Sequence, residues 1–141
     1  MSPKKILVVD DDAVILKTLY TKLTGKGYEV VTVSDGSEAV TAVRRSKPDL
    51  ILLDVTLPVD VGMDWNAFNI MEWLKHVPEA KGTPVIIISG GDPKKIMDKA
   101  VAAGATGFFQ KPINHDELDK LIKRTLGIEN TPTPPSFTLK T

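Results

Sequence analysis

Short runs of aliphatic residues recur along the chain and are separated by stretches with helical periodicity. Three of the runs are unbroken apolar tetrapeptides rich in β-branched residues, which is typical of strands buried on both faces of a parallel sheet. Two further runs are less regular, and one of these alternates in a way that indicates a position nearer an edge. The predicted strands are residues 6–9, 28–33, 50–53, 85–88 and 107–109.

Amphipathic stretches fill the intervals between these runs. They open on residues whose side chains cap helices, and several of them end at glycine. The predicted N-caps are Asp12, Asp35, Asp92 and Asn114. A regular alternation of strand and helix predicts an α/β fold with right-handed crossovers.

Two segments interrupt this alternation. A long connection follows the third strand, and it contains Pro58, Gly62 and Trp65. The final residues, 128–141, are rich in proline and threonine and offer little to pack. We expect them to form a linker or a frayed terminus.

The composition argues against several classes of protein and of binding site. Eighteen basic residues balance eighteen acidic ones, which argues against direct nucleic-acid binding because phosphate contacts usually need a basic surface. The chain has no cysteine, so thiolate metal sites and disulfides are excluded, and a reducing compartment such as the cytoplasm fits. No apolar run is long enough to span a membrane, and no signal peptide is evident.

Polar side chains follow four of the five predicted strands. Asp10 and Asp11 come directly after the first strand, Asp54 follows the third, Ser89 follows the fourth and Lys111 lies after the fifth. The carboxyl ends of parallel strands lie along one edge of the sheet, where open α/β folds bind ligands. We therefore expect these residues to form one site.

The residue types at this edge limit its chemistry. Carboxylates held close together repel unless a cation lies between them. Oxygen ligands without cysteine or histidine suit Mg²⁺, or alternatively Mn²⁺. A lysine and a serine hydroxyl can hold phosphoryl oxygens, and an aspartate beside the metal can act as a nucleophile. The set predicts metal-assisted phosphoryl transfer to an aspartate.

Four motifs in this order resemble the receiver domain of the response regulators of two-component signalling. They are ILVVDDD at 6–12, DLILLDVTLP at 49–58, PVIIISG at 84–90 and GATGFFQKP at 104–112. The resemblance implies a flavodoxin-like (βα)5 fold over residues 4–127, a doubly wound five-stranded parallel sheet with strand order 2-1-3-4-5.

The resemblance also implies a role for each site residue. Asp54 would accept a phosphoryl group from a histidine kinase or a histidine phosphotransfer protein. Asp11 would bind Mg²⁺ directly, Asp10 through water, and Asp54 and the Thr56 backbone carbonyl would complete the protein ligands. Lys111 would pair with the phosphoryl group.

Two further residues would carry the switch that the resemblance implies. Ser89 would be the hydroxyl that moves to the phosphoryl oxygen, and Phe108 the aromatic residue that changes rotamer. Serine at 89 and phenylalanine at 108 are both within the range of the family. The loss of a tyrosine hydroxyl at 108 removes one hydrogen bond that the switch could use.

On this interpretation the chain is a signalling domain and not an enzyme, with at most self-phosphorylation from small donors and self-dephosphorylation. Its partners would be the kinase or phosphotransfer protein and a downstream output protein or output domain. The face made by the fourth helix, the fifth strand and the fifth helix would change on phosphorylation and could support a homodimer. No membrane partner is expected, and the location would be cytoplasmic.

The chain departs from the family after the third strand. An extended loop at about residues 55–66 replaces a short turn. Aligning Glu72 with the usual start of the third helix leaves an insertion of about eight residues, which is beyond ordinary loop lengths. Trp73 would then lie on the core face of that helix. The inserted residues could cover Asp54 or contact a partner.

Two other functions stay open on the residues alone. Residues 10–12 also satisfy the Asp-x-Asp pattern of haloacid-dehalogenase-type phosphatases, in which Asp10 would be the nucleophile. A receiver-like adaptor whose inserted loop closes the site would act without phosphorylation. Asp12 is interpreted as a helix cap, and His76 and His115 as surface helix residues.

Overall fold

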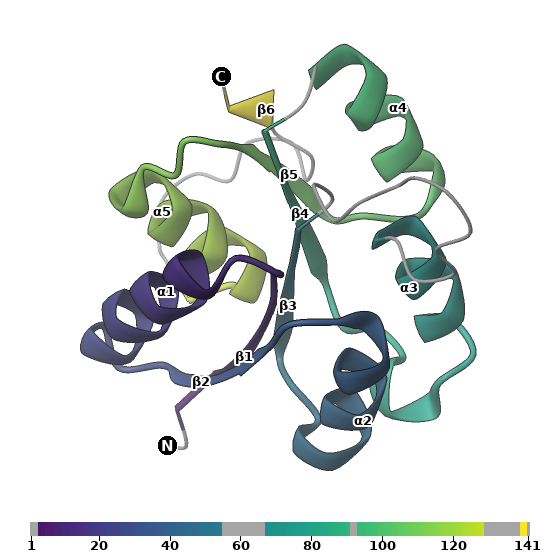
Figure 1. Ribbon diagram of the computed structural model, residues 1–141, viewed down its shortest axis with the longest axis horizontal. Helices are drawn as coiled ribbons and strands as arrows, with labels where there is room; N and C mark the ends of the chain where they lie inside the picture. The colour runs from purple at the N-terminus through teal and green to yellow at the C-terminus, as the bar shows by residue number, and fades with distance from the viewer. Residues whose placement is uncertain (1–2, 55–66, 91–92, 129–138, 141) are drawn as a thin grey trace.

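The computed structural model describes residues 3–54, 67–90, 93–128 and 139–140 (Figure 1). Strands and helices alternate along the chain, as predicted. In chain order the elements are β1 (Lys5–Val9), α1 (Ala13–Gly25), β2 (Glu29–Val33), α2 (Gly36–Ser46), β3 (Leu50–Asp54), α3 (Ala67–Leu74), the short 3₁₀ helix η1 (Pro78–Ala80), β4 (Val85–Ser89), α4 (Pro93–Ala102), β5 (Gly107–Gln110), α5 (His115–Leu126) and β6 (Leu139–Lys140).

The strands form one sheet in the order β2-β1-β3-β4-β5-β6, and every neighbouring pair is parallel. The predicted five-stranded order 2-1-3-4-5 is confirmed. The sixth strand was not predicted: residues 139–140 of the C-terminal segment pair with β5. Residues 129–138 lie outside the described part of the chain.

Alternate residues of β1 to β5 enter one of two apolar cores. The helices that cover the two faces of the sheet are seen in Figure 1. Leu7, Ile51 and Ile87 pack with α2, α3 and α4 on one face of the sheet. Ile6, Leu52 and Ile86 pack with α1 and α5 on the other face. This period of two explains why the tetrapeptides are wholly apolar: both faces of the central strands are covered.

The helix starts show how closely local sequence controls this fold. Asp35 accepts a hydrogen bond from the Glu38 N–H at 2.8 Å, and Asn114 accepts one from the Glu117 N–H at 3.1 Å, so both predicted caps are confirmed. The third helix begins at Ala67, not at Glu72 as the alignment with the family predicted. Among the described residues, the structure contains no helix of the length and hydrophobicity that a membrane span requires.

A buried polar cluster joins α5 to the start of β2. The Tyr28 hydroxyl donates to Asp119 Oδ1 at 3.0 Å, and Asp119 is only 7% exposed. Lys123 and Lys26 lie 3.2 and 3.8 Å from Asp119 Oδ2. A buried carboxylate needs such compensation because burial removes its hydration. The cluster therefore holds α5 against the α1–β2 corner.

We expect Tyr28→Phe to lower the free energy of unfolding by about 1 kcal/mol, because it removes one hydrogen bond and leaves the two lysines beside Asp119. Urea denaturation measures the change. Tyr20→Phe is the matched control, since Tyr20 is 49% exposed on α1 and its hydroxyl is not part of this cluster. Equal losses of unfolding free energy in the two variants would contradict a stabilising role for the hydrogen bond from Tyr28 to Asp119.

Candidate functional site

The register of the sheet brings the predicted site residues to one edge. Val9 pairs with Leu53, and Asp54 pairs with Ile88, so Asp10, which follows β1, and Ser89, the last residue of β4, lie at the level where β3 ends. Ser89 in turn pairs with Gln110, which Lys111 follows. The carboxylates, the hydroxyl and the ammonium group therefore come from the carboxyl ends of four parallel strands, as predicted.

Asp10 is the buried acid of this edge, with 2% of its surface exposed. Its Oδ1 accepts a hydrogen bond from the Asp12 N–H at 2.9 Å, and its Oδ2 lies 3.6 Å from Lys111 Nζ. Its own N–H donates to the Val33 carbonyl at 3.2 Å, which ties the segment after β1 to β2. Asp11, by contrast, is exposed. The neighbouring acids thus differ: one is held in the protein and the other faces solvent.

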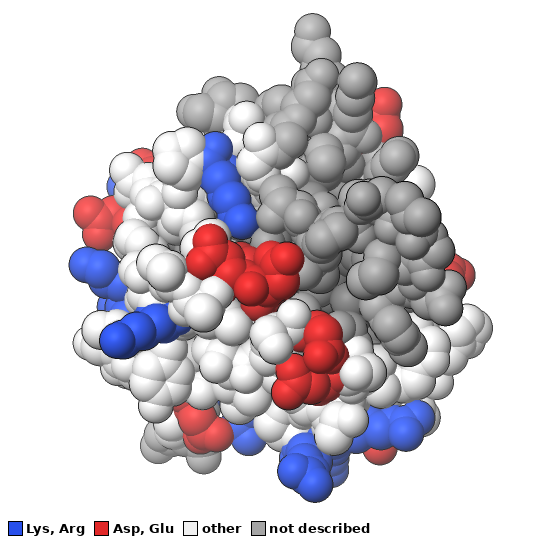
Figure 2. All heavy atoms as spheres, in the orientation of Figure 1, with Lys and Arg blue, Asp and Glu red and all other residues white. Residues whose placement is uncertain are grey.

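Lys111 reaches Asp10 across the middle of the sheet edge. β3 and β4 lie between β1 and β5, and adjacent strands are about 4.8 Å apart. An ion pair between the two residues requires the Lys111 side chain to extend over the ends of β4 and β3. Figure 2 shows acidic side chains gathered in the middle of the viewed face with a basic side chain against them. The ammonium group therefore lies near the strand end that carries Asp54.

Ser89 and Phe108 are both fully buried. The Ser89 carbonyl accepts the Lys111 N–H at 2.8 Å, so the ends of β4 and β5 are linked by their backbones. Phe108 packs in the core beneath α2, α3 and α4, whereas its neighbour Phe109 packs beneath α1 and α5. A shift of the Ser89 backbone would therefore act directly on the strand that carries Phe108.

Part of the predicted ligand set lies outside the described residues. The backbone of Asp54 is described but its side chain is not, and Thr56 and Trp65 fall in the segment 55–66. Among the side chains that the structure describes, no group of three histidines, cysteines or acids is placed to bind a metal. The described donors, Asp10 and Asp11, are carboxylates at a partly desolvated edge, which suits a hard divalent cation.

Asp12 caps α1, as predicted. Its Oδ1 accepts hydrogen bonds from the N–H groups of Val14 at 2.9 Å and Ile15 at 3.4 Å. Both bonds use donors that the first turn of a helix leaves without partners. The role of Asp12 in this structure is to begin α1 immediately after the two site acids.

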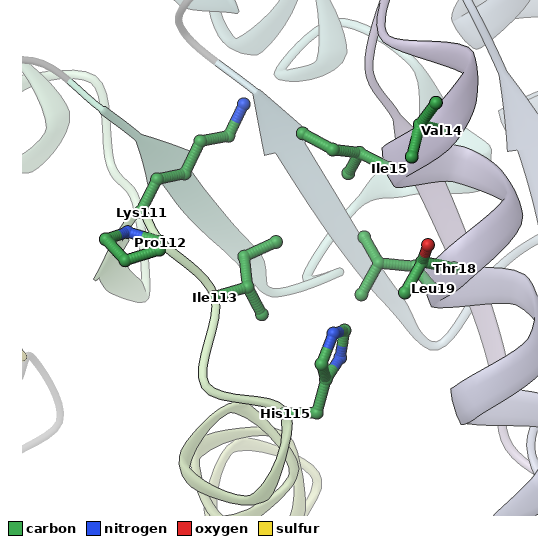
Figure 3. A pocket seen from close by; sticks show the side chains of 8 residues that line it. All are labelled: Val14, Ile15, Thr18, Leu19, Lys111, Pro112, Ile113 and His115. Atoms are coloured by element: carbon green, nitrogen blue, oxygen red, sulfur yellow. The ribbon is translucent and has the colours of Figure 1, made fainter.

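His115 lies closer to the site than its sequence position indicated. It is half-buried and lines a cavity of about 270 Å³ with Val14, Ile15 and Lys111, between α1 and the segment after β5 (Figure 3). Burial is the main reason that its pKa falls below the usual 6.5, and the positive charges of Lys22 and Lys26 act in the same direction. The expectation of a surface histidine is met only in part, because α1 lies beside the first turn of α5, which no local pattern reveals.

The prediction for His76 is met in full and the prediction for Trp73 in part. His76 is exposed, as expected. Trp73 is half-buried against the core of the α2–α4 face, and the Arg44 guanidinium of α2 lies 5.3 Å from its ring centroid. This distance is within the range of a cation–π contact. The tryptophan thus joins α3 to α2.

Comparisons with known proteins point to one family. A family profile described as the response regulator receiver domain matches residues 6–123. Response regulator PleD of Caulobacter vibrioides is 39% identical over 110 residues, which are 78% of this chain and 23% of PleD. The polar-differentiation response regulator DivK of Brucella anthropi is 30% identical over 125 residues, covering 89% of this chain and 98% of DivK.

Other relatives are much longer than the matched region. The probable transcriptional regulatory protein TcrX of Mycobacterium tuberculosis is 32% identical over 127 residues, covering 87% of this chain and 51% of TcrX. The chain therefore spans about a quarter of PleD and half of TcrX. The remaining parts of those proteins have no counterpart in the alignment.

Solved structures of receiver domains superpose well on this fold. The chemotaxis response regulator CheY4 of Vibrio cholerae gives a TM-score of 0.76 at 32% identity, covering 86% of this chain and 98% of that one. The receiver domain of a sensor histidine kinase from Pseudomonas aeruginosa, described with a magnesium ion coordinated in its active-site cleft, gives 0.77 at 26% identity, covering 89% and 98%.

We expect Asp12→Ala to lower the free energy of unfolding by about 1 kcal/mol, because α1 loses its capping oxygen. Chemical denaturation measures the loss. Asp12→Ser keeps a capping oxygen and should recover most of the stability. If serine were no better than alanine, the capping role would be refuted.

Protonation of His115 should make stability depend on pH. Because its pKa is lowered in the folded state, the unfolded chain binds more protons just below pH 6.5, so the free energy of unfolding falls as the pH drops below about 6.5. His115→Gln should remove this part of the slope, measured as the difference from wild type across the titration. His76→Gln, at an exposed position, is the control and should keep the slope.

Proposed function

The chain belongs to the response regulator receiver family of two-component signalling, and on that premise we propose that it is a phosphorylation switch in which Asp54 is the phosphoacceptor. Asp10, Asp11, Ser89 and Lys111 would serve the transfer. Phe108 would pass the change to the α4-β5-α5 face. The protein would be a signalling domain, with at most self-phosphorylation from small donors and self-dephosphorylation.

The observation that carries this proposal is the ion pair between Lys111 Nζ and Asp10 Oδ2 at 3.6 Å. It requires a cation to lie across the ends of β3 and β4, the strands that end in Asp54 and Ser89. A positive charge at that place stabilises the Asp10 carboxylate before the transfer and would stabilise a phosphoryl oxygen after it.

The transfer itself would be a displacement at phosphorus. One Asp54 carboxylate oxygen forms a bond to phosphorus as the bond from phosphorus to the donor's histidine nitrogen breaks, and the product is an acyl phosphate. The electron pair of the broken bond stays on the imidazole. Lys111 would then exchange part of its interaction with Asp10 for the new phosphoryl oxygens.

The described residues fit a divalent metal, and Mg²⁺ is the ion we propose, with Mn²⁺ as a substitute. Asp11 would be a direct ligand and Asp10 would act through water, in keeping with the exposure of the first and the burial of the second. Asp54 and the Thr56 carbonyl would complete the protein ligands. When bound, the metal would neutralise part of the charge that the phosphoryl oxygens bring.

Ser89 and Phe108 would convert the new charge into a change of shape. The Ser89 hydroxyl would donate to a phosphoryl oxygen, and its movement would pull on Lys111 through the 2.8 Å bond from the Lys111 N–H to the Ser89 carbonyl. Phe108, three residues before Lys111 on β5, lies in the core in this structure. Its rotamer would change with the backbone of β5 and alter the α4-β5-α5 face.

The partners follow from this role. A histidine kinase or a histidine phosphotransfer protein would supply the phosphoryl group, which places the chain in the cytoplasm. An output protein or an output domain would read the α4-β5-α5 face, and that face could also support a homodimer. Direct contact with nucleic acid or membrane is not part of the proposal.

We expect the full chain to take up one phosphoryl group from a small phosphodonor in the presence of Mg²⁺, and Asp54→Asn to take up none. Intact-mass spectrometry measures the uptake, and fluoroberyllate should shift amide resonances near Ser89 in wild type only. Asp49→Asn is the matched control, because Asp49 lies at the opposite end of the same strand and binds the Lys5 N–H. It should be phosphorylated like wild type.

Uptake that persists in Asp54→Asn, or that does not need a divalent metal, would refute the proposal. Turnover of a generic phosphomonoester that is lost in Asp10→Asn would instead support a haloacid-dehalogenase-type phosphatase. The burial of Asp10 and its contacts to Lys111 and to the Asp12 N–H already make it a poor nucleophile.

A further inference from the structure

The outer edge of β5 is not open in this structure. β6 lies beside it as a parallel strand, with Phe108 opposite Leu139 and Phe109 opposite Lys140 (Figure 1). The pairing comes from the C-terminal segment of the same chain, beyond the helix that follows β5. The other edge of the sheet, β2, has no such strand among the described residues.

The backbone of β5 shows which groups face β6. Along a strand, successive N–H groups point alternately to the two neighbouring strands. The Lys111 N–H points to β4, since it donates to the Ser89 carbonyl at 2.8 Å. The Gln110 N–H therefore points away from β4, toward β6, and the Phe109 N–H points back toward β4. The same register turns the backbone of Lys140 toward β5.

An uncovered edge strand presents a row of N–H and C=O groups that can pair with any extended peptide. Here the chain supplies the peptide itself. The pairing is intramolecular, so it does not weaken when the protein is diluted. Within the described residues it is two residues long, so a longer extended segment could replace it.

We propose that the outer edge of β5 is a strand-docking site whose resident occupant is the chain's own segment at Leu139–Lys140, and that a partner pairing with this edge must displace it. Only the assignment of this edge to an output face rests on the proposed function above. The docking of the segment does not, because it is argued from the pairing of β6 with β5 alone. The site would accept an extended peptide that runs parallel to β5.

Lys140→Pro in the full chain tests the proposal, because proline removes the N–H that faces β5. Lys140→Ala removes the side chain and keeps the N–H. Amide hydrogen exchange, followed by NMR without phosphodonor, gives the ratio of the rates at Gln110 and Phe109. We expect this ratio to rise by about three- to tenfold in Lys140→Pro, as loss of one hydrogen bond predicts, and to stay near wild type in Lys140→Ala.

Using the ratio corrects for any general loss of stability, since Phe109 faces β4 and reports on the rest of the sheet. An unchanged ratio in Lys140→Pro would overturn the proposal. So would protection of Gln110 that grows with protein concentration, because the occupant would then be the segment of a second copy. Neither result depends on phosphorylation of Asp54, so this proposal and the proposed function can fail separately.

Discussion

The buried carboxylate of Asp10 is the constraint on which the functional edge depends. A carboxylate this far from water is stable only if the protein supplies positive charge and hydrogen bonds. The chain provides them from two directions: the Asp12 N–H beside it and Lys111 from the far side of the sheet. To meet this demand the Lys111 side chain crosses two strand ends, and in doing so it brings an ammonium group to the place where phosphate chemistry would occur.

The rest of the fold can be understood as the support for that crossing. Two apolar cores pack against the two faces of the sheet and hold the strand ends together. The caps at Asp12 and Asn114 start α1 and α5 directly beside the site. The cluster of Tyr28 and Asp119 holds α5 against the α1–β2 corner. Each of these contacts reduces the freedom of one of the segments that carry site residues.

β5 connects the separate parts of the molecule. Phe109 and Phe108 anchor it in the two cores, its end carries Lys111 into the site, and its outer edge pairs with β6. A change in the backbone hydrogen bond between Lys111 and Ser89 would therefore affect a core, the site and the outer edge of β5 together. In the proposed function, this shared position would let one short strand link charge at the site to the surface that a partner meets.

Much of this molecule follows from local sequence. Unbroken aliphatic runs determine the buried strands and short polar side chains determine where helices begin, because these features depend only on neighbours along the chain. The positions of Asp10, Ser89 and Lys111 after their strands predicted a shared edge, given a parallel sheet. Only the tertiary structure decided which residues touch. The reach of Lys111 to Asp10, the bond from Tyr28 to Asp119, the partial burial of His115 beside α1 and the return of residues 139–140 to β5 all join positions far apart in sequence. Strand order, and the packing of helices on the sheet, set those distances, and no local pattern encodes them.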